Sequence, residues 1–279
     1  ILPSKLVLCE HAEKLIVALN LRKQHDEFGN IMEAAIRKVL AKRSVKQLER
    51  SHLTNQDLFY REVTKIDDLF WAFVELENET IVQEQSNSKA SQTQIFSITD
   101  IITSVFAEVR FYRQANGAIY QSAALADCNY TPWTAKEHVS GVRETLLKQF
   151  ALLIKCSAID HNTYIAANDE CKYNAIGQKI VDLADIILDS YAFQLSFLSA
   201  SNEKYSVPKS AFQGNRYNCL MPLLRLKQYE RAASLAEKYE DFDILIKICA
   251  ELNNHERLQQ YTQQFAQKGF SEHLFDWYL

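Results

Sequence analysis

The stretch RAASLAEKYEDFDILIKICAEL, residues 231–252, contains two helical stripes separated by a short acidic break. In its first half, small and apolar residues recur at helical spacing, namely Ala232, Leu235, Ala236 and Tyr239. Small side chains on one helix face let a neighbouring helix approach toward the short end of the usual interaxial range of roughly 8–10 Å. After Asp241 a second apolar stripe begins. The stretch therefore predicts a helical hairpin whose small-residue face is packed against a neighbour.

A second hairpin follows the first. Phe242 and Phe270 each begin the second helix of a pair, 28 residues apart, and Gly269 ends the helix between them. Helical repeats of roughly 34 residues stack into solenoids because one pair of helices is too thin to bury its own apolar faces. The sequence thus predicts helical-pair repeats at 216–279 and an all-α fold, an elongated and irregular α-helical solenoid of stacked helix pairs.

The composition of the whole chain favours the same fold class. Its 279 residues are 47% hydrophobic and 24% charged, with only 6 glycines and 4 prolines. Strand-rich folds need turn residues every eight to twelve positions or so, and these are missing. We therefore expect about ten to twelve helices in a single solenoid over residues 1–279. Its two sub-blocks are expected at 1–127 and 128–279.

The first third is predicted to hold three helices. An amphipathic helix over 5–21 carries one stripe that we expect to face the core, made of Leu8, Ala12, Leu15, Ile16 and Leu19. After a break at Gly29, a second helix covers 30–40. Thr54 and Asp57 resemble a capping box, which predicts the start of one long helix running to residue 82.

Two polar connectors, 86–94 and 199–215, and an aperiodic stretch at 127–141 separate the later helices. The helix predicted over 176–198 has a strong apolar stripe. Its aspartates lie on the opposite face, which we interpret as solvated; they are Asp182, Asp185 and Asp189.

The charge pattern gives no general attraction to nucleic acid, since the net charge is -4 and the pI is near 6.0. The basic run 37–50 is interpreted as the solvated face and end of a helix. Six scattered cysteines without a C-x-x-C pair indicate buried reduced thiols and a nuclear or cytosolic compartment. No apolar run approaches the roughly 18 residues that cross a bilayer. We expect neither nucleic-acid nor membrane contact, and a monomer in isolation.

No phosphate-binding, metalloprotease or nucleophile-elbow motif occurs, so no cofactor, metal site or catalytic residue is predicted. Two competing hypotheses remain open. Asp182, Asp185 and Asp189, with Asp67 and Asp68, could bind magnesium diphosphate as in all-helical prenyl-transfer enzymes, because hard oxygen ligands suit that ion. Alternatively, the repeats could form an adaptor that binds a peptide or protein partner in its groove.

Two groups of aromatic residues each allow two interpretations. In the irregular stretch, Tyr130, Pro132 and Trp133 either form a ligand platform or hold the loop against the helices beneath it. We favour the second interpretation, because an indole ring buries a large apolar area. An apolar cluster lies at the end of the chain; its members are Leu274, Phe275, Trp277 and Tyr278. It is either a partner interface or the continuation seam, the surface on which a following helix packs, and we favour the second interpretation. Because the chain begins without methionine and stops within a helical pattern, we expect it to be a fragment.

Five blocks together resemble, in the same order, the middle α-helical region of the nucleoporin one-thirty-three family, which belongs to the outer-ring Y-shaped complex of the nuclear pore. They are LCEHAEKLIVALNLRKQHDEFGNIMEAAIRKVL (8–40), LTNQDLFYREVTKIDDLF (53–70), YTPWTA (130–135), AASLAEKYEDFDILIKIC (232–249) and RLQQYTQQFAQKGFSEHLFDWYL (257–279). Rare aromatic residues in a fixed order make these blocks distinctive, since helical periodicity alone would not produce them. The similarity is weakest at 77–100 and 160–215.

The resemblance implies a structural, non-enzymatic segment of the pore scaffold at the nuclear envelope, supporting transport of mRNA and protein. It implies that the segment is a rigid spacer arm. The family's contact with the neighbouring Y-complex nucleoporin, number one hundred and seven, is made by helices expected beyond Leu279. No partner-binding residue is therefore carried over to this chain.

Overall fold

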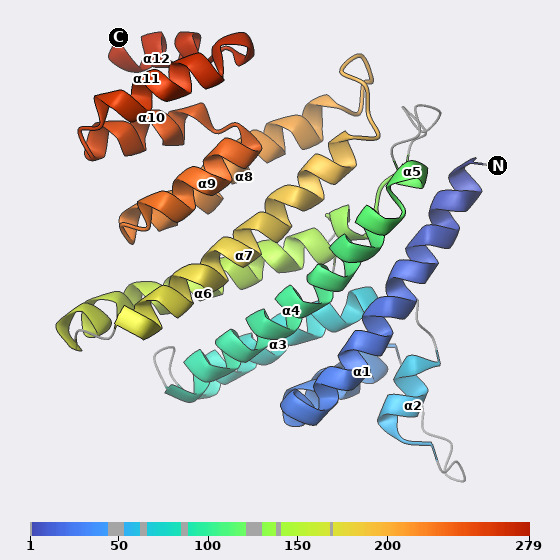
Figure 1. Ribbon diagram of the computed structural model, residues 1–279. Coiled ribbons are helices and arrows are strands. Elements are labelled where there is room, and N and C mark those ends of the chain that lie inside the picture. The colour runs from blue at the N-terminus through green and yellow to red at the C-terminus, as the bar shows by residue number, and fades with distance from the viewer. Residues whose placement is uncertain are drawn as a thin grey trace.

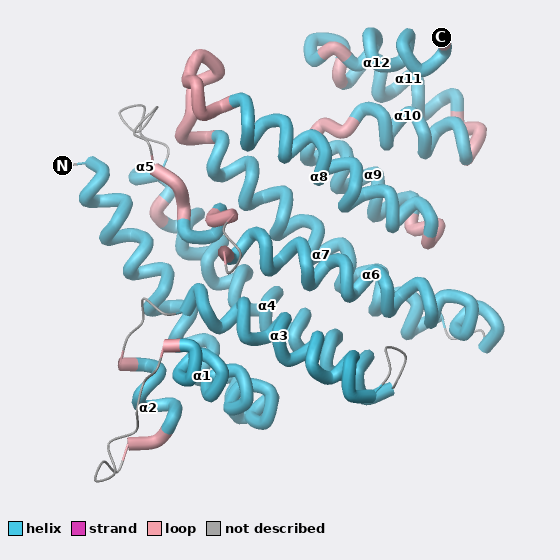
Figure 2. The backbone as a smooth tube through the Cα atoms, turned by 180° about the vertical axis from the view of Figure 1, so that it is seen from behind, coloured by secondary structure: helices cyan, strands magenta, loops and turns pink. Residues whose placement is uncertain are grey.

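The computed structural model describes residues 2–43, 53–61, 66–84, 89–120, 130–137, 141–167 and 170–279. Within these ranges it holds twelve α-helices, two short 3-10 helices and no strand (Figure 2). The predicted all-α class and the expected number of helices are thus confirmed for the described part of the chain. None of the helices there is both long and apolar enough to cross a bilayer.

The helices have the following bounds. The first five are α1 (Leu2–Lys42), α2 (Asn55–Tyr60), α3 (Ile66–Glu84), α4 (Lys89–Ala115) and α5 (Gly117–Tyr120). A 3-10 turn over Trp133–Ala135 precedes α6 (Val142–Ala167), α7 (Glu170–Leu195) and α8 (Ser206–Arg225). The last four helices are α9 (Tyr229–Tyr239), α10 (Phe242–Glu251), α11 (His255–Gln264) and α12 (Phe270–Tyr278), with a 3-10 turn over Ala266–Lys268.

The helices stack in order from α1 at one end to α12 at the other (Figure 1). In one row α1 contacts α4, α4 contacts α7 and α7 contacts α9, while α3 contacts α6 behind them. One apolar core runs through the stack from Val17 in α1 to Phe270 in α12. The protein exposes 14856 Å², whereas a compact monomer of its mass exposes about 12,300 Å². The excess of about a fifth is that of an elongated body.

The hairpins of the last third follow from local capping. Glu240 adopts a left-handed conformation at the end of α9, and the Asp241 side chain accepts a hydrogen bond from the Ile244 amide at the start of α10. Gly269, with φ of 83°, ends the next connection and directly precedes α12. Phe242 and Phe270, which begin α10 and α12, contact each other with ring centroids 5.4 Å apart. The two repeats are therefore joined through equivalent residues.

Three sequence predictions about element boundaries are wrong. The capping box at Thr54 and Asp57 is present, but α2 ends at Tyr60 and a separate helix begins at Ile66. The predicted connectors 86–94 and 199–215 are partly helical, because α4 begins at Lys89 and α8 at Ser206. The break expected at Gly29 is present one residue earlier, as a kink at Phe28, whose backbone angles are non-helical (φ -116°, ψ 31°). Polar residues that cap or face solvent in a helix look like loop residues in sequence.

The stripe expected to face the core in α1 is also wrong in part. Leu8, Leu15 and Leu19 are exposed, and the buried face of α1 is built from other residues, including Leu6 and Val17. The helix has apolar residues on two faces, and its neighbours, which include α2, α3 and α4, leave Leu8, Leu15 and Leu19 uncovered.

Candidate functional site

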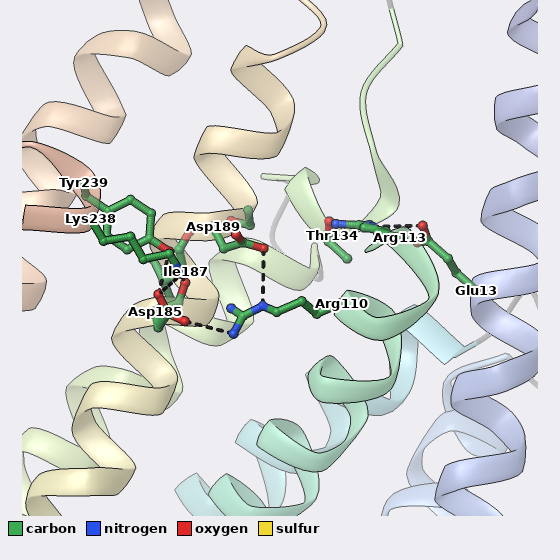
Figure 3. Close-up of polar contacts among 10 residues, drawn as sticks. Glu13, Arg110, Arg113, Thr134, Asp185, Ile187, Asp189, Lys238 and Tyr239 are labelled. Atoms are coloured by element: carbon green, nitrogen blue, oxygen red, sulfur yellow. Dashed lines mark hydrogen bonds and ion pairs between the residues drawn. The ribbon is translucent and has the colours of Figure 1, made fainter. Parts of the chain in front are cut away.

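A cluster of five polar residues joins α4, α7 and α9, and we call it the Asp185 cluster; its members are Arg110, Asp185, Asp189, Lys238 and Tyr239 (Figure 3). Asp185 Oδ2 lies 2.9 Å from Arg110 Nη1, and its Oδ1 lies 2.7 Å from Lys238 Nζ. The Tyr239 hydroxyl donates to Asp185 Oδ1 at 2.6 Å. One carboxylate thus ties three consecutive helices of a row together.

The protonation of the Asp185 cluster follows from these contacts. Burial raises the pKa of Asp185, but hydrogen bonds from Lys238 and Tyr239 and the charge of Arg110 outweigh it and hold the pKa below its usual value. Burial and the adjacent carboxylate raise the pKa of Tyr239. Asp185 is therefore ionised at neutral pH and Tyr239 keeps its proton, which is the arrangement the hydrogen bonds require.

The interpretation of the α7 aspartates as a solvated face is wrong for Asp185, whose side chain is only 15% exposed. A hollow of about 440 Å³ between α4 and α7 is lined by Asp100, Asp182, Asp185 and Arg110 among others. Its most buried carboxylate is neutralised by Arg110 and Lys238, not left open to a cation. Within the described residues, no group of three or more His, Cys, Asp or Glu side chains could hold a metal.

A second cluster surrounds Glu13, which is almost fully buried in α1. Arg113 donates to both of its carboxylate oxygens, with both distances at 2.9 Å. The Tyr120 hydroxyl donates at 2.6 Å and the Trp133 indole at 2.7 Å. Burial, followed by the Glu13 charge and hydrogen bond, raises the pKa of Tyr120, so this hydroxyl stays a donor. Glu13 therefore fixes α4, α5 and the irregular loop onto α1.

The irregular loop holds the three aromatic and proline residues singled out from sequence. Trp133 is fully buried, and its ring centroid lies 6.2 Å from those of Phe70 and Phe106. The Tyr130 hydroxyl donates to Glu10 at 3.0 Å. The Pro132 carbonyl accepts from the Ala135 amide and starts the 3-10 turn. The Trp133 indole faces the core, where its one donor is used by Glu13.

A third buried contact joins α3 to α6. Gln149 Nε2 donates to Glu77 Oε1 at 2.8 Å and to Thr99 Oγ1 at 3.2 Å. Glu77 Oε2 and Gln149 Oε1 have no hydrogen-bond partner in the described part of the chain. Burial raises the pKa of Glu77 well above its usual value, against the opposing hydrogen bond from Gln149. A proton on Glu77 Oε2 would provide the donor that Gln149 Oε1 lacks.

The residues of the opening stretch lie in the core. Ala232 and Ala236 are fully buried on α9, which contacts α7, α8 and α10. Tyr239 reaches α7 through Asp185, and Phe242 contacts the rings of Phe265 and Phe270. The small side chains thus lie where α9 is surrounded on three sides.

The apolar cluster at the end of α12 is mostly open. Phe275, Trp277 and Tyr278 are exposed, while Leu274 is half-buried against the core. The Trp277 and Tyr278 rings contact each other edge to face at 5.4 Å. The structure does not bring this cluster near the Asp185 cluster, the Glu13 cluster or the irregular loop.

The sequence analysis did not single out Glu13, Arg110 or Arg113, whose polar contacts join the helices. For Glu13 a signal was present. It falls four residues from both Cys9 and Val17, so it lies on the same helical face as two apolar residues. A carboxylate within an apolar stripe needs a buried partner, because an unpaired buried charge is costly. Its partner Arg113 lies 100 residues away, so no local sequence pattern identifies it.

Comparisons with known proteins place this architecture in a family. Residues 169–279 match the family described as non-repetitive/WGA-negative nucleoporin C-terminal. The chain is 34% identical over 280 residues to nuclear pore complex protein Nup133 of Homo sapiens, a match that covers 99% of this chain and 23% of the human protein. It is 33% identical over 282 residues to Nup133 of Danio rerio, covering 99% of this chain and 24% of that protein.

A more distant relative also matches nearly the whole chain. Nup133 of Drosophila melanogaster is 27% identical over 279 residues, covering 99% of this chain and 22% of that protein. The chain thus spans about a quarter of the length of the curated relatives it matches. Matches that extend over nearly the whole chain confirm the resemblance drawn from the five sequence blocks. The chain belongs to the Nup133 family of nuclear pore complex proteins.

Proposed function

We propose that this chain is a rigid spacer arm of the outer-ring scaffold of the nuclear pore complex, located at the nuclear envelope. The observation that carries this proposal is the unbroken core from α1 to α12 in an elongated body. Each pair of helices is braced by the next, so the stack fixes the distance and angle between whatever binds at its ends. Through this role the arm would support transport of mRNA and protein.

The two polar clusters contribute to this stiffness. Buried hydrogen bonds to a charged group are lost when helices slide past one another, and each contributes about 1.5–3 kcal/mol. The Glu13 cluster fixes the α1 end, and the Asp185 cluster fixes the middle of the stack. They lie on successive helices of one row, since Arg110 and Arg113 both belong to α4. Bending of the row formed by α1, α4, α7 and α9 would have to break at least one of them.

We propose further that the arm assembles with other nuclear pore scaffold proteins, and that the neighbouring Y-complex nucleoporin, number one hundred and seven, binds through a region beyond Leu279. The segment itself has no catalytic role and is a monomer in isolation. The half-buried Leu274 and the exposed residues after it are proposed as the seam toward that region.

A linker exchange in the full-length protein tests the spacer role. This segment is replaced by a flexible Gly-Ser linker of equal residue number, and the protein is expressed in cells depleted of their own copy. We expect the exchanged protein to co-precipitate with scaffold partners but not to restore mRNA export. Restored export would mean that stiffness is dispensable. Lost co-precipitation would mean that the segment binds partners directly.

Small-angle scattering of the 279-residue chain tests the shape. A compact particle of this length has a radius of gyration of about 19 Å, and the arm is expected to exceed it clearly. The enzyme alternative is tested by thermal unfolding with and without magnesium and diphosphate. The spacer role predicts no change in midpoint, because only a ligand that binds the folded state raises it.

One observation favours the adaptor alternative. A groove of about 620 Å³ between α6 and α8 is lined mainly by apolar residues, including Leu147, Phe150, Ile154 and Pro222. A peptide could lie along it. Precipitation from nuclear extract with a protein extended past Leu279 should recover Y-complex subunits if the chain is a scaffold. An adaptor would recover unrelated proteins that share a peptide motif.

A further inference from the structure

The groove between α6 and α8 is a valley with one helix face on each side. It has a volume of about 620 Å³, and among the described residues that line it none belongs to α7, although α7 contacts both helices. The lining residues recur at helical spacing, with Leu147, Ala151 and Ile154 on α6 and Asn218 and Pro222 on α8. The walls are therefore continuous stripes, and most of their residues are apolar.

The two helices that form the walls run in the same direction. Arg143 of α6 and Asn215 of α8 both contact the C-terminal end of α7. A tyrosine near the start of α7 donates to the carbonyl of Leu226, which directly follows α8. Since α6 ends where α7 starts, Lys155 of α6 and Arg225 of α8 lie toward the same end of the groove.

That end of the groove carries positive charge without a counter-charge. Lys155 and Arg225 are exposed, and neither forms an ion pair with any residue that the structure describes. No acidic residue lies within four positions of either one along the chain. The first acid after Arg225 is Glu230, which pairs with Arg257 at 2.7 Å. An acidic group that enters this end of the groove therefore meets two free cations.

The other end of the groove is neutral. Glu144 is the one acidic side chain among the described residues that line the groove, and it lies 3.5 Å from Lys148, one turn further along α6. These two charges compensate each other. The groove is thus asymmetric, with a neutral end, an apolar middle and a positive end.

The wall formed by α8 contains a proline inside the helix. Pro222 has no amide hydrogen, so the carbonyl of Asn218 lacks its usual helical donor. Asn218 is exposed and lines the groove, and its side-chain amide can donate as well as accept. The apolar middle of the groove therefore offers polar groups to which an occupant can form hydrogen bonds.

We propose that this groove docks an amphipathic helix of a partner protein, with the acidic end of that helix beside Lys155 and Arg225. A helix suits the valley because each wall is itself a helix face, and helices that dock in grooves present anchors at i, i+3, i+4 and i+7. The stripe on α6 extends for about 16 Å, or three helical turns. A bilayer surface is too broad to enter a valley between two helices. The proposal deepens the adaptor alternative, since it names the occupant of the groove, and it does not depend on the spacer role.

Fluorescence anisotropy with a labelled peptide tests the proposal. The probe is an amphipathic peptide of about 18 residues, with leucines at i, i+3, i+4 and i+7 spacing and glutamates at one end only. We expect saturable binding to the 279-residue chain. Ala151→Glu places a charged side chain in the middle of the groove and should weaken binding at least tenfold. Ala151 is exposed, so equal melting temperatures will show that the variant still folds.

A charge exchange tests the predicted acidic end. Lys155→Glu with Arg225→Glu should weaken binding of the acidic peptide several-fold. A peptide with lysines in place of the glutamates should bind this double variant more tightly than it binds the natural protein. Both effects should shrink at high salt, because the charges are at the surface. Ala107→Glu, at an exposed position of α4, is the matched control for Ala151→Glu and should leave binding unchanged.

Several results would overturn the proposal. One is no binding of the acidic peptide, or equal binding to Ala151→Glu; another is binding that the charge exchange does not alter. Vesicles of phosphatidylserine that bind the natural protein but not Ala151→Glu, without peptide binding, would assign the groove to a membrane. Concentration-dependent dimers that Ala151→Glu abolishes would assign it to a second copy of the chain.

Failure of this proposal can be told apart from failure of the proposed functions. If the acidic peptide does not bind while nuclear extract still yields unrelated proteins that share a peptide motif, the adaptor alternative stands and the acidic helix is wrong. The spacer role is tested separately by linker exchange, so neither result decides the other.

Discussion

Glu77 offers the sharpest test of the buried polar contacts. Its carboxyl lies beside the Gln149 amide, and each side chain has one oxygen without a partner in the described structure. If Glu77 carries a proton in the folded state, its hydroxyl donates to Gln149 and both oxygens are satisfied. Glu77→Gln has nearly the same shape and provides the same donor permanently. We therefore expect this variant to fold and to become the more stable protein as pH rises.

The sign and size of the effect follow from proton binding. Burial raises the pKa of Glu77 in the folded state, so the stabilisation it gives is complete below the unfolded pKa and is lost as pH rises toward the folded value. As long as folded Glu77 keeps its proton, each pH unit above the unfolded pKa lowers the free energy of unfolding of the natural protein by about 1.4 kcal/mol, because only the unfolded chain releases the proton. Between pH 5 and pH 7 the free energy of unfolding of Glu77→Gln should therefore rise relative to that of the natural protein, by no more than about 3 kcal/mol.

Urea unfolding followed by circular dichroism at pH 5, 6 and 7 measures this difference. Glu75→Gln, which removes a half-buried carboxyl from the same helix, is the matched control for a general effect of the lost charge. A constant difference for Glu77→Gln across this range would refute the reasoning, because it would mean that Glu77 is ionised in the folded protein. A Glu77→Gln protein that is less stable at pH 7 would refute it too.

Three further predictions concern other residues. Trp133→Ala should lower the free energy of unfolding by about 3–5 kcal/mol in urea titrations, whereas Trp277→Ala, on the exposed end of α12, should change it by less than about 0.5 kcal/mol. Asp185→Asn should cost about 2 kcal/mol at pH 7. Because contacts in the fold lower the pKa of Asp185, its contribution is present above the unfolded pKa and lost as pH falls, so this cost should shrink in acid unfolding between pH 5 and pH 3. Burial raises the pKa of Cys219 to about 12, so mass spectrometry after iodoacetamide treatment should find this thiol alkylated only when urea unfolds the protein.

The sequence predicted the last third best, since its signals are local. Asp241 caps the helix that begins one residue later, and Gly269 takes the left-handed conformation that its position between helices requires. Phe242 and Phe270 begin equivalent helices, as their spacing indicated. Each of these features depends on residues within one or two helical turns, which is the range over which a sequence pattern carries information.

The starting residues of α4 and α8 were harder to predict from the sequence. The predicted connectors at 86–94 and 199–215 are rich in serine and asparagine, which favour turns in an isolated chain. In the fold, residues from Lys89 and from Ser206 onward are helical, and Ser91 and Pro208 within those stretches are buried. Tertiary packing overrides a weak local preference of a few tenths of a kcal/mol per residue.

The amino-acid sequence by itself determined that this protein is a stack of short-range helical hairpins, because helical periodicity, caps and small-residue faces are written within each segment. Only the tertiary structure decided which apolar face of α1 is covered, and which of the α7 aspartates is buried. It also decided that Glu13 meets Arg113, 100 residues away. The reason is physical: a helix fixes the direction of its own side chains, but the burial and charge state of each depend on neighbours that the rest of the chain brings beside it.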